Sequence, residues 1–387
     1  MRIAIASEYA RPWPGGISEH VHHEARELAR LGHEVAVLTG PARGEAERAS
    51  QDGYAVQRFR PAPRFRSNGA ASRIALDPRL LALRRRLVAL RAEVVHVHAP
   101  LDPLLGWAAV LASPVPVVGS FHASFEPGAL WELLYRRLRP LTARVFARLR
   151  ARIAVSEEAE RCIGHYFPAA YARIPNGVDL ARFRPGLPPP PGLAPGRPRA
   201  LCVARADPRK GLPLLLAAMP ELLRRVPDAE LVVVGVAARE AARWIAGTAP
   251  ALRAALRFEG YVAPALLPRY YAACDVFCSP ATRGESQGVV LLEALASGTP
   301  PVVFDIPGYR EVVCDRHDAR VAARGEPAAL AAALAELLAD AALRARLAAA
   351  GRKTASGYAW PGVARRLEQC FLAARRGASG GASGGAV

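Results

Sequence analysis

Short apolar runs alternate with amphipathic segments along most of the chain. The segments 2–7 and 35–39 are continuous apolar runs of strand length, and 17–31 between them has the 3.6-residue period of an amphipathic helix. Further strand-like runs occur at 94–98, 115–122 and 152–156. Strands separated by helices predict a parallel sheet that is covered on both faces.

A proline-rich stretch at 184–192 interrupts this alternation and favours a semi-rigid linker. A second series follows, with strands at 200–204, 230–235, near 258, 276–278 and 302–304, helices at 212–225 and 265–273, one long helix at 328–350, and a last helix at 360–376. The sequence thus predicts an α/β protein with an N-terminal Rossmann-like domain (1–183), a linker (184–199), a C-terminal Rossmann-like domain (200–359) and a disordered tail (377–387).

The composition agrees with two domains and gives the chain a large positive net charge. The chain has 387 residues, more than one ordinary core needs, and 52 Lys and Arg against 34 Asp and Glu give a net charge of +18. This balance suits an anionic substrate or surface, although a compositional bias toward Ala and Arg explains it equally well. Six scattered cysteines in mostly apolar segments indicate reduced thiols. Without a signal peptide or a 20-residue apolar run, we expect a cytoplasmic protein, at most peripheral on the inner face of the cell membrane.

Two carboxylates mark the strongest motif. Glu285 and Glu293 stand eight positions apart in a stretch that follows a strand and opens a helix. Helical spacing would put both on one face, and the loop from Gly284 to Gly288 would present backbone N–H groups to an anion. A solvated helix face is the alternative. The strand, loop, helix, strand order favours a ligand site, here for a sugar nucleotide, because open α/β sheets bind ligands at this edge.

Two cations follow the first strand of the second domain. Arg205 and Lys210 can neutralise a diphosphate in place of a metal ion, whereas a basic turn that caps a helix is the alternative. No D-x-D motif follows a strand, so we expect no metal. The opening βαβ unit lacks G-x-G-x-x-G, so no dinucleotide cofactor is predicted.

These motifs in this order resemble those of the retaining glycosyltransferases with the GT-B fold, in which two Rossmann-like domains face each other across a cleft. Over nearly the whole chain, further stretches are similar to bacterial phosphatidylinositol mannosyltransferases. They are Tyr9 with Pro14-Gly15-Gly16, Asn68-Gly69 with Arg73, His96-Val97-His98, Phe121-His122, Pro175-Asn176-Gly177-Val178-Asp179, Pro208-Arg209-Lys210-Gly211 and Gly284-Glu285-Ser286.

The resemblance implies a retaining, metal-independent transfer of a hexosyl group from a nucleotide-diphosphate sugar. The best match is mannose from GDP-mannose to the inositol of a phosphatidylinositol-like lipid, with the leaving phosphate helping to take the acceptor proton. The last helix would cross back onto the first domain. The implied catalytic residues are His122, Glu285, Arg205 and Lys210, with His122 facing the transferred sugar.

The resemblance also implies binding roles. Glu285 would bond sugar hydroxyls, Glu293 the ribose, and the Gly15-Gly16 loop would close over the sugar. The implied donor-binding residues are Gly15, Gly16, Arg205, Lys210, Val262, Glu285, Ser286, Gln287, Gly288, Val289 and Glu293. The implied acceptor-binding residues are Tyr9, Gly16, Asn68 and Arg73.

The sequence departs from the mannosyltransferases at two places, which leaves other donors and acceptors open. The segment 263–267 lacks the acid and the lysine that hold guanine in those mannosyltransferases, which leaves a UDP-sugar and another lipid or soluble acceptor open. Gln287 replaces their usual phenylalanine near the sugar, so the sugar is open too. Outside this class, a non-catalytic nucleotide-sugar binder or a Rossmann oxidoreductase remains.

A basic segment at 77–91 predicts a helix that starts at Asp77 and carries five arginines. Its leucines 80, 83, 87 and 90 form one stripe, which either packs on the sheet or leaves the arginines to contact an anionic membrane. The basic loop with arginines 58, 60, 64 and 66 adjoins it. No aromatic residue is interleaved with arginines 79–91, so no nucleic-acid partner is predicted. His96 and His98 are expected to be structural, and 176–179 an inter-domain turn.

Overall fold

The computed structural model describes residues 1–13, 15–40, 48–59, 64–67, 70–73, 83–102, 104–122, 129–193 and 196–379. The chain divides into two compact units, which differ slightly from the predicted domains. Unit 1 comprises Met1–Gly177 and Trp360–Val387, and unit 2 comprises Val178–Ala359. The division therefore falls inside the turn 176–179, six residues before the predicted boundary at 183.

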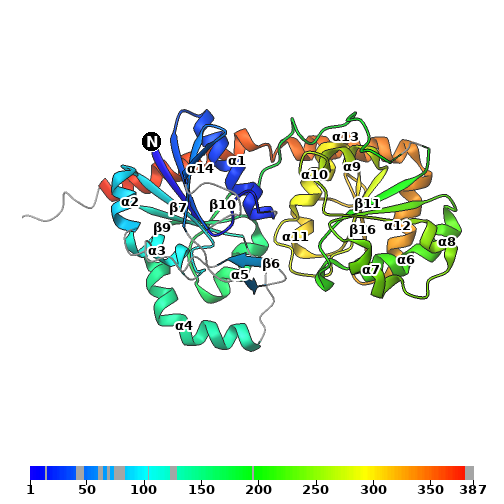
Figure 1. Ribbon diagram of the computed structural model, residues 1–387, viewed down its shortest axis with the longest axis horizontal. Helices are drawn as coiled ribbons and strands as arrows, with labels where there is room; N and C mark the ends of the chain where they lie inside the picture. The colour runs from blue at the N-terminus through cyan, green and yellow to red at the C-terminus, as the bar shows by residue number, and fades with distance from the viewer. Residues whose placement is uncertain are drawn as a thin grey trace, which may run out of the picture. The chain divides into compact units, whose positions relative to one another are not determined.

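Unit 1 is built on an eight-stranded sheet (Figure 1). Its strands are β1 (Arg2–Ser7), β2 (Glu34–Thr39), β3 (Arg48–Gln51), β4 (Tyr54–Arg58), β7 (Val94–His98), β8 (Val117–Phe121), β9 (Leu149–Ala154) and β10 (Ala172–Arg173). The order is β10-β9-β8-β7-β1-β2-β4-β3, parallel except for β3, which pairs with β4 in antiparallel fashion. A separate hairpin joins β5 (Arg64–Ser67) and β6 (Ala70–Arg73).

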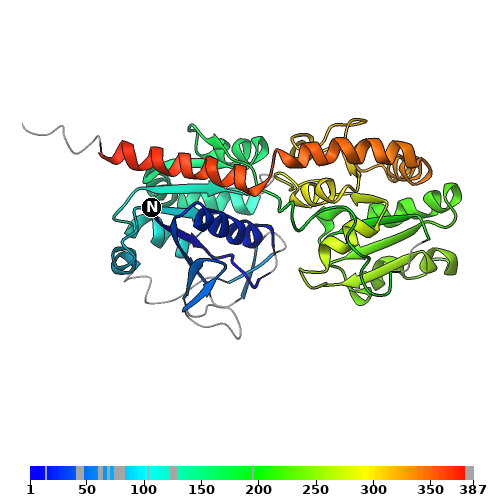
Figure 2. The same cartoon turned by 90° about the horizontal axis from the view of Figure 1, so that it is seen from above.

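Helices cover both faces of this sheet, as predicted. They are α1 (Gly16–Arg30), α2 (Leu83–Ala89), α3 (Leu105–Ala112), α4 (Ala129–Ala147), α5 (Glu157–Tyr166) and α14 (Trp360–Ser379). Ile3 and Ile5 share a core with residues of α1 and α14, while Ala4 and Ala6 on the opposite face share one with residues of α2 and α3. Helix α14 lies along unit 1 (Figure 2) and extends three residues beyond the predicted end at 376, into the expected tail.

Unit 2 contains a six-stranded, fully parallel sheet. Its strands are β11 (Arg199–Val203), β12 (Glu230–Val234), β13 (Leu256–Gly260), β14 (Val276–Ser279), β15 (Pro301–Phe304) and β16 (Arg320–Ala322). The order β13-β12-β11-β14-β15-β16 makes the direction of winding reverse between β11 and β14. Open α/β sheets bind ligands at the carboxyl ends of the strands at such a reversal.

The helices of unit 2 include one correction to the sequence prediction. They are the 3₁₀ turn η2 (Pro208–Lys210), α6 (Leu212–Arg225), α7 (Ala238–Ile245), α8 (Pro250–Ala254), α9 (Leu267–Ala273), α10 (Val289–Ser297), α11 (Pro307–Arg310), α12 (Pro327–Ala339) and α13 (Ala341–Ser356). The single helix expected at 328–350 is wrong. Asp340 leaves helical geometry, and its carboxylate accepts a hydrogen bond from the Leu343 N–H at 2.8 Å, which ends α12 and caps α13.

Two glycines let the loops of unit 2 approach each other. A Cβ atom at Gly308 would lie 2.0 Å from the Glu285 carbonyl oxygen, and one at Gly211 would lie 1.8 Å from the Pro280 carbonyl oxygen. Both obstructing atoms belong to the backbone, so a side chain could be accommodated only by moving the chain. The loop that contains Glu285 is thus positioned by the start of α11.

We predict that Gly308→Ala destabilises the protein by about 1–3 kcal/mol or more, the usual cost of forcing extra atoms into a packed site. Urea denaturation measures this change. The matched control is Gly362→Ala in α14, where an added Cβ has no atom within 4 Å. Equal midpoints for Gly308→Ala and the parent would show that the loop is not held by this contact.

Candidate functional site

The reversal in unit 2 brings the two predicted motifs to one edge. Strands β11 and β14 pair in parallel, with Ala200 opposite Val276 and Leu201 opposite Phe277. Their carboxyl ends therefore lie side by side, and the loop with Arg205 and Lys210 leaves the sheet beside the loop with Glu285. A backbone hydrogen bond from Thr282 N to Arg209 O, 3.0 Å long, joins these two loops.

Lys210 and Glu285 form an ion pair at this junction. The Lys210 Nζ atom lies 2.5 Å from Glu285 Oε1, and the side chains are 22% and 11% exposed. Asp207 holds the turn before them, because its carboxylate accepts hydrogen bonds from the Arg209 N–H at 3.0 Å and from the Arg209 guanidinium at 2.8 Å. Arg209 also donates to the Gly284 carbonyl at 3.5 Å, which ties the turn to the Glu285 loop. The pair is therefore held from both sides and still reaches solvent.

The two glutamates do not share a helical face, so that argument was wrong. Helix α10 begins at Val289, its N-cap Gly288 has φ +75°, and Glu285 lies in the loop before it. Only Glu293 belongs to the helix. No side chain caps α10 within the described structure, which leaves the N–H groups of its first turn available to an anion.

Glu293 is oriented by a residue that the sequence analysis missed. The hydroxyl of Tyr271, on α9, donates to Glu293 Oε2 at 2.8 Å. Tyr271 is completely buried, and this burial, with the Glu293 charge, raises the pKa of Tyr271 well above its usual value. The tyrosine therefore remains a hydrogen-bond donor to Glu293, whose side chain is partly exposed. The contact joins residues 22 apart in sequence, so no local pattern indicates it.

The remaining predicted donor residues differ in how exposed they are to solvent. Arg205 is exposed two residues beyond β11, and Val262, Ser286 and Val289 are partly exposed. Gln287 is buried, with 2% of its surface accessible. A Cβ at Gly288 would lie 2.7 Å from the Tyr309 ring, so the ring packs directly against the start of α10.

In unit 1 the strand order reverses between β1 and β7, and three predicted residues follow β1. Gly15 and Gly16 are exposed, with nothing within 4 Å of either Cβ position, and Tyr9 is partly exposed. A ligand can approach this backbone closely. Of the other acceptor predictions, Asn68 and the side chain of Arg73 lie outside the described residues.

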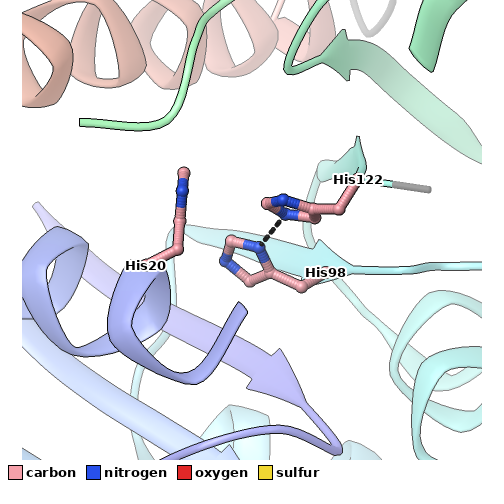
Figure 3. Close-up of side chains that lie close together, drawn as sticks. All are labelled: His20, His98 and His122. Carbon is pink, nitrogen blue, oxygen red and sulfur yellow. Dashed lines mark hydrogen bonds between the residues drawn. The ribbon is translucent and has the colours of Figure 1, made fainter. Parts of the chain in front are cut away.

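His122 follows β8 and belongs to a group of histidines (Figure 3). Its Nε2 atom is hydrogen-bonded to His98 Nδ1 at 2.8 Å, and its ring meets that of His20, on α1, edge to face. Burial and the neighbouring His20 and His98 hold the pKa of His122 well below its usual value. His122 is therefore a neutral, partly exposed imidazole. His98, which was expected to be only structural, is its direct partner.

The basic helix is described from residue 83 onward. Leu83 and Leu87 are completely buried in the core, so this part of the leucine stripe packs on the fold. Arg84 and Arg85 are exposed, and the Arg86 guanidinium lies 5.1 Å from the centre of the Phe59 ring. Among the described residues, no helix combines the length and apolar character needed to cross a bilayer.

Two family models match adjoining parts of the chain. Residues 14–182 match Glycosyltransferase Family 4, and residues 185–354 match Glycosyl transferases group 1. A phosphatidyl-myo-inositol mannosyltransferase from Mycolicibacterium smegmatis is 34% identical over 96% of this chain and 93% of its own length. A glycogen synthase from Mycobacterium tuberculosis is 30% identical over 97% of this chain and 96% of its own.

Solved structures support the fold. Anabaena Alr3699/HepE in complex with UDP-glucose superposes with a TM-score of 0.74 at 19% identity, covering 96% of this chain and 99% of that one. WaaG, a glycosyltransferase involved in lipopolysaccharide biosynthesis, superposes with a TM-score of 0.68 at 18% identity, covering 95% and 99%. The predicted architecture of two Rossmann-like domains is confirmed: this protein belongs to the group 1 glycosyltransferases and has the GT-B fold.

Proposed function

We propose that the protein transfers a hexosyl group from a nucleotide-diphosphate sugar, bound by unit 2, to an acceptor hydroxyl with retention of anomeric configuration. The Lys210–Glu285 pair at the β11–β14 reversal carries this proposal. In a nucleotide-diphosphate sugar, an accessible cation can bind the diphosphate and an accessible carboxylate beside it can bind the sugar hydroxyls. The superposition on a UDP-glucose complex supports the same ligand class.

Each group has a chemical task in this scheme. Lys210 turns from Glu285 to the diphosphate, where it and Arg205 stabilise the negative charge that develops on the leaving group. Glu285 then accepts hydrogen bonds from sugar hydroxyls. Glu293, oriented by Tyr271, accepts one from the ribose. The uncapped N-terminus of α10 adds N–H groups and a favourable dipole for the phosphates.

Retention follows when attack and departure occur on one face of the sugar. The bond from the anomeric carbon to the leaving phosphate oxygen breaks, and that oxygen accepts the proton of the acceptor hydroxyl while the new glycosidic bond forms. We assign His122 to the transferred sugar. A neutral imidazole can bond a hydroxyl there without adding a positive charge beside an electron-poor anomeric carbon.

Mannose from GDP-mannose is our preferred donor because of the mannosyltransferase relatives, and a UDP-sugar is the alternative. Two observations favour the alternative. The segment 263–267 has no charged residue to hold guanine, and Anabaena Alr3699/HepE in complex with UDP-glucose superposes on this chain with a TM-score of 0.74. A binder without catalysis is the remaining class.

Release of nucleotide from a panel of GDP- and UDP-sugars tests this proposal. We expect one donor to be turned over, and Lys210→Ala and Glu285→Ala to lower kcat by about 100-fold or more. Lys353→Ala and Glu326→Ala are matched controls, because both side chains are exposed outside the site, and Lys353 is the only other lysine in the chain. Turnover of no donor, with nucleotide binding unchanged in the variants, would contradict an enzyme and favour a binder.

Metal dependence is a second test of the same site. Because side-chain cations face the diphosphate, we expect activity to survive EDTA. Loss that Mg²⁺ restores would show that Arg205 and Lys210 are not the main phosphate ligands.

We further propose a lipid acceptor of the phosphatidylinositol type, reached at an anionic membrane surface. The relatives' names support the acceptor. The exposed Arg84 and Arg85 on α2, next to the exposed Val88, support the surface, because each arginine near an anionic bilayer contributes about 1 kcal/mol. Such a contact places the enzyme on the inner face of the cell membrane.

Sedimentation with liposomes tests the membrane contact. We expect binding to rise with the anionic lipid fraction and to fall with salt. Arg84→Ser with Arg85→Ser should weaken it by about 30-fold, the equivalent of about 2 kcal/mol. Arg346→Ser with Arg365→Ser removes the same charge at exposed positions elsewhere and should change it little. If both double variants weakened binding equally, the binding would depend on net charge and not on α2. Equal binding of the parent to neutral and anionic vesicles would favour a soluble acceptor.

A further inference from the structure

Unit 1 contains a buried group of ionisable side chains that the proposed transfer does not use. His20 and Glu24 lie one turn apart on α1, and His96 and His98 lie on the facing strand β7. All four are at most 3% exposed, and Glu24 is completely buried. A carboxylate is seldom buried unless it is paired or coordinates a metal ion.

The outer atoms of this group are held by hydrogen bonds. Glu24 Oε1 lies 2.5 Å from His96 Nδ1, and His96 Nε2 lies 2.7 Å from Ser120 Oγ. His20 Nδ1 bonds Asn176 Oδ1 at 2.8 Å, and His98 Nδ1 bonds His122 Nε2 at 2.8 Å (Figure 3). These bonds fix the orientation of each ring and use only one side of His20, Glu24 and His98.

The inner atoms are left without such bonds. Glu24 Oε2 lies 2.9 Å from His98 Nε2 and 3.5 Å from His20 Nε2. None of these three buried atoms has a hydrogen-bond partner in suitable geometry among the described residues. Leaving buried polar atoms unsatisfied costs about 1–3 kcal/mol each, so the arrangement calls for a cation that all three can bind.

We propose that Glu24 Oε2, His20 Nε2 and His98 Nε2 bind a divalent metal ion of the zinc class. Tetrahedral zinc with bonds of about 2.0–2.1 Å places its ligand atoms about 3.3 Å apart. The observed 2.9 and 3.5 Å lie on either side of that value. His20 and His98 belong with His122 to one group whose ligand atoms lie within 4.8 Å of one another, and Glu24 and His98 belong with His96 to another. The proposed set combines members of both groups, and binding the ion requires the Nε2 atoms of His20 and His98 to turn toward it.

The hydrogen bonds around the proposed ligands suit this ion. Metal-bound imidazoles usually donate their other N–H to an acceptor, here Asn176 for His20 and His122 for His98. Two histidines and one glutamate form a zinc set with one position left for water.

Cobalt binding tests the site. The full-length protein, stripped with a chelator and then dialysed, is titrated with Co²⁺, whose visible absorption reports its coordination number. We expect one Co²⁺ per chain with the intense bands of a four-coordinate ion, displaced by Zn²⁺. Protein purified without chelator should contain zinc by elemental analysis. A stripped protein that takes up no Co²⁺ would overturn the proposal and assign the buried charge to a proton shared between Glu24 and the histidines.

Variants identify the ligands. Glu24→Gln keeps the shape of the side chain and His98→Asn removes a ring, and both should weaken Co²⁺ binding at least about 100-fold. His122→Asn removes only an orienting bond, so about 10-fold is expected. His165→Asn, at an exposed histidine on α5, should have no effect.

Thermal unfolding distinguishes a variant that has lost a metal ligand from one that folds poorly. The Tm of the parent should rise with free Zn²⁺, because the ion binds the folded state, whereas that of metal-free Glu24→Gln should not. Co²⁺ binding by Glu24→Gln that equals the parent's would overturn the assignment. Neither result depends on glycosyl transfer, so the metal site and the proposed function fail independently.

Discussion

The pairing of β11 with β14 is the constraint on which the proposed donor site depends. Two parallel strands that neighbour each other must deliver their following loops at the same edge, and the winding reverses there, so no other strand separates them. The cation loop and the carboxylate loop thus meet although their key residues are 75 positions apart. Gly211 and Gly308 make the approach close enough for an ion pair, because backbone takes the room that side chains would need. The chemistry of the site is therefore a consequence of strand order.

Local pattern was sufficient for much of this fold. Continuous apolar runs located β1, β2, β7 and the strands of unit 2 except β16, which was not predicted, and the helical period located α1 and α6. Burial of one face or of both faces of an element produces such a pattern. This periodic pattern is weak where alanine is abundant. In 328–350 the apolar character continues across Asp340, and only the capping bond shows that two helices meet there. For Glu285 the spacing was real, but the helix starts after it, since Gly288 in a left-handed conformation ends the loop.

The residues of the candidate sites likewise include some that the sequence indicates and others that only the structure shows. Lys210 and Glu285 could be found from motifs that stand next to strands. The partners that orient the site could not, because Tyr271 reaches Glu293 from another helix and Glu24 reaches His96 from 72 positions away. An alternating His-x-His strand has no sequence signal that distinguishes core histidines from ligands. Its meaning depends on which helix packs over it and on whether that helix carries a carboxylate.

Because the chain has only two lysines, the amine of the Lys210–Glu285 pair can be distinguished chemically from the other side-chain cations. Besides the N-terminus, Lys210 and Lys353 provide the only primary amines of the chain, whose other side-chain cations are guanidinium groups and imidazoles. Acylating reagents must reach the amine that they modify, and the Lys210 side chain lies against Glu285 and is only 22% exposed. The Lys353 side chain is exposed to solvent. The relative modification of two amines in one chain thus reports whether the ion pair is closed or has opened for a ligand.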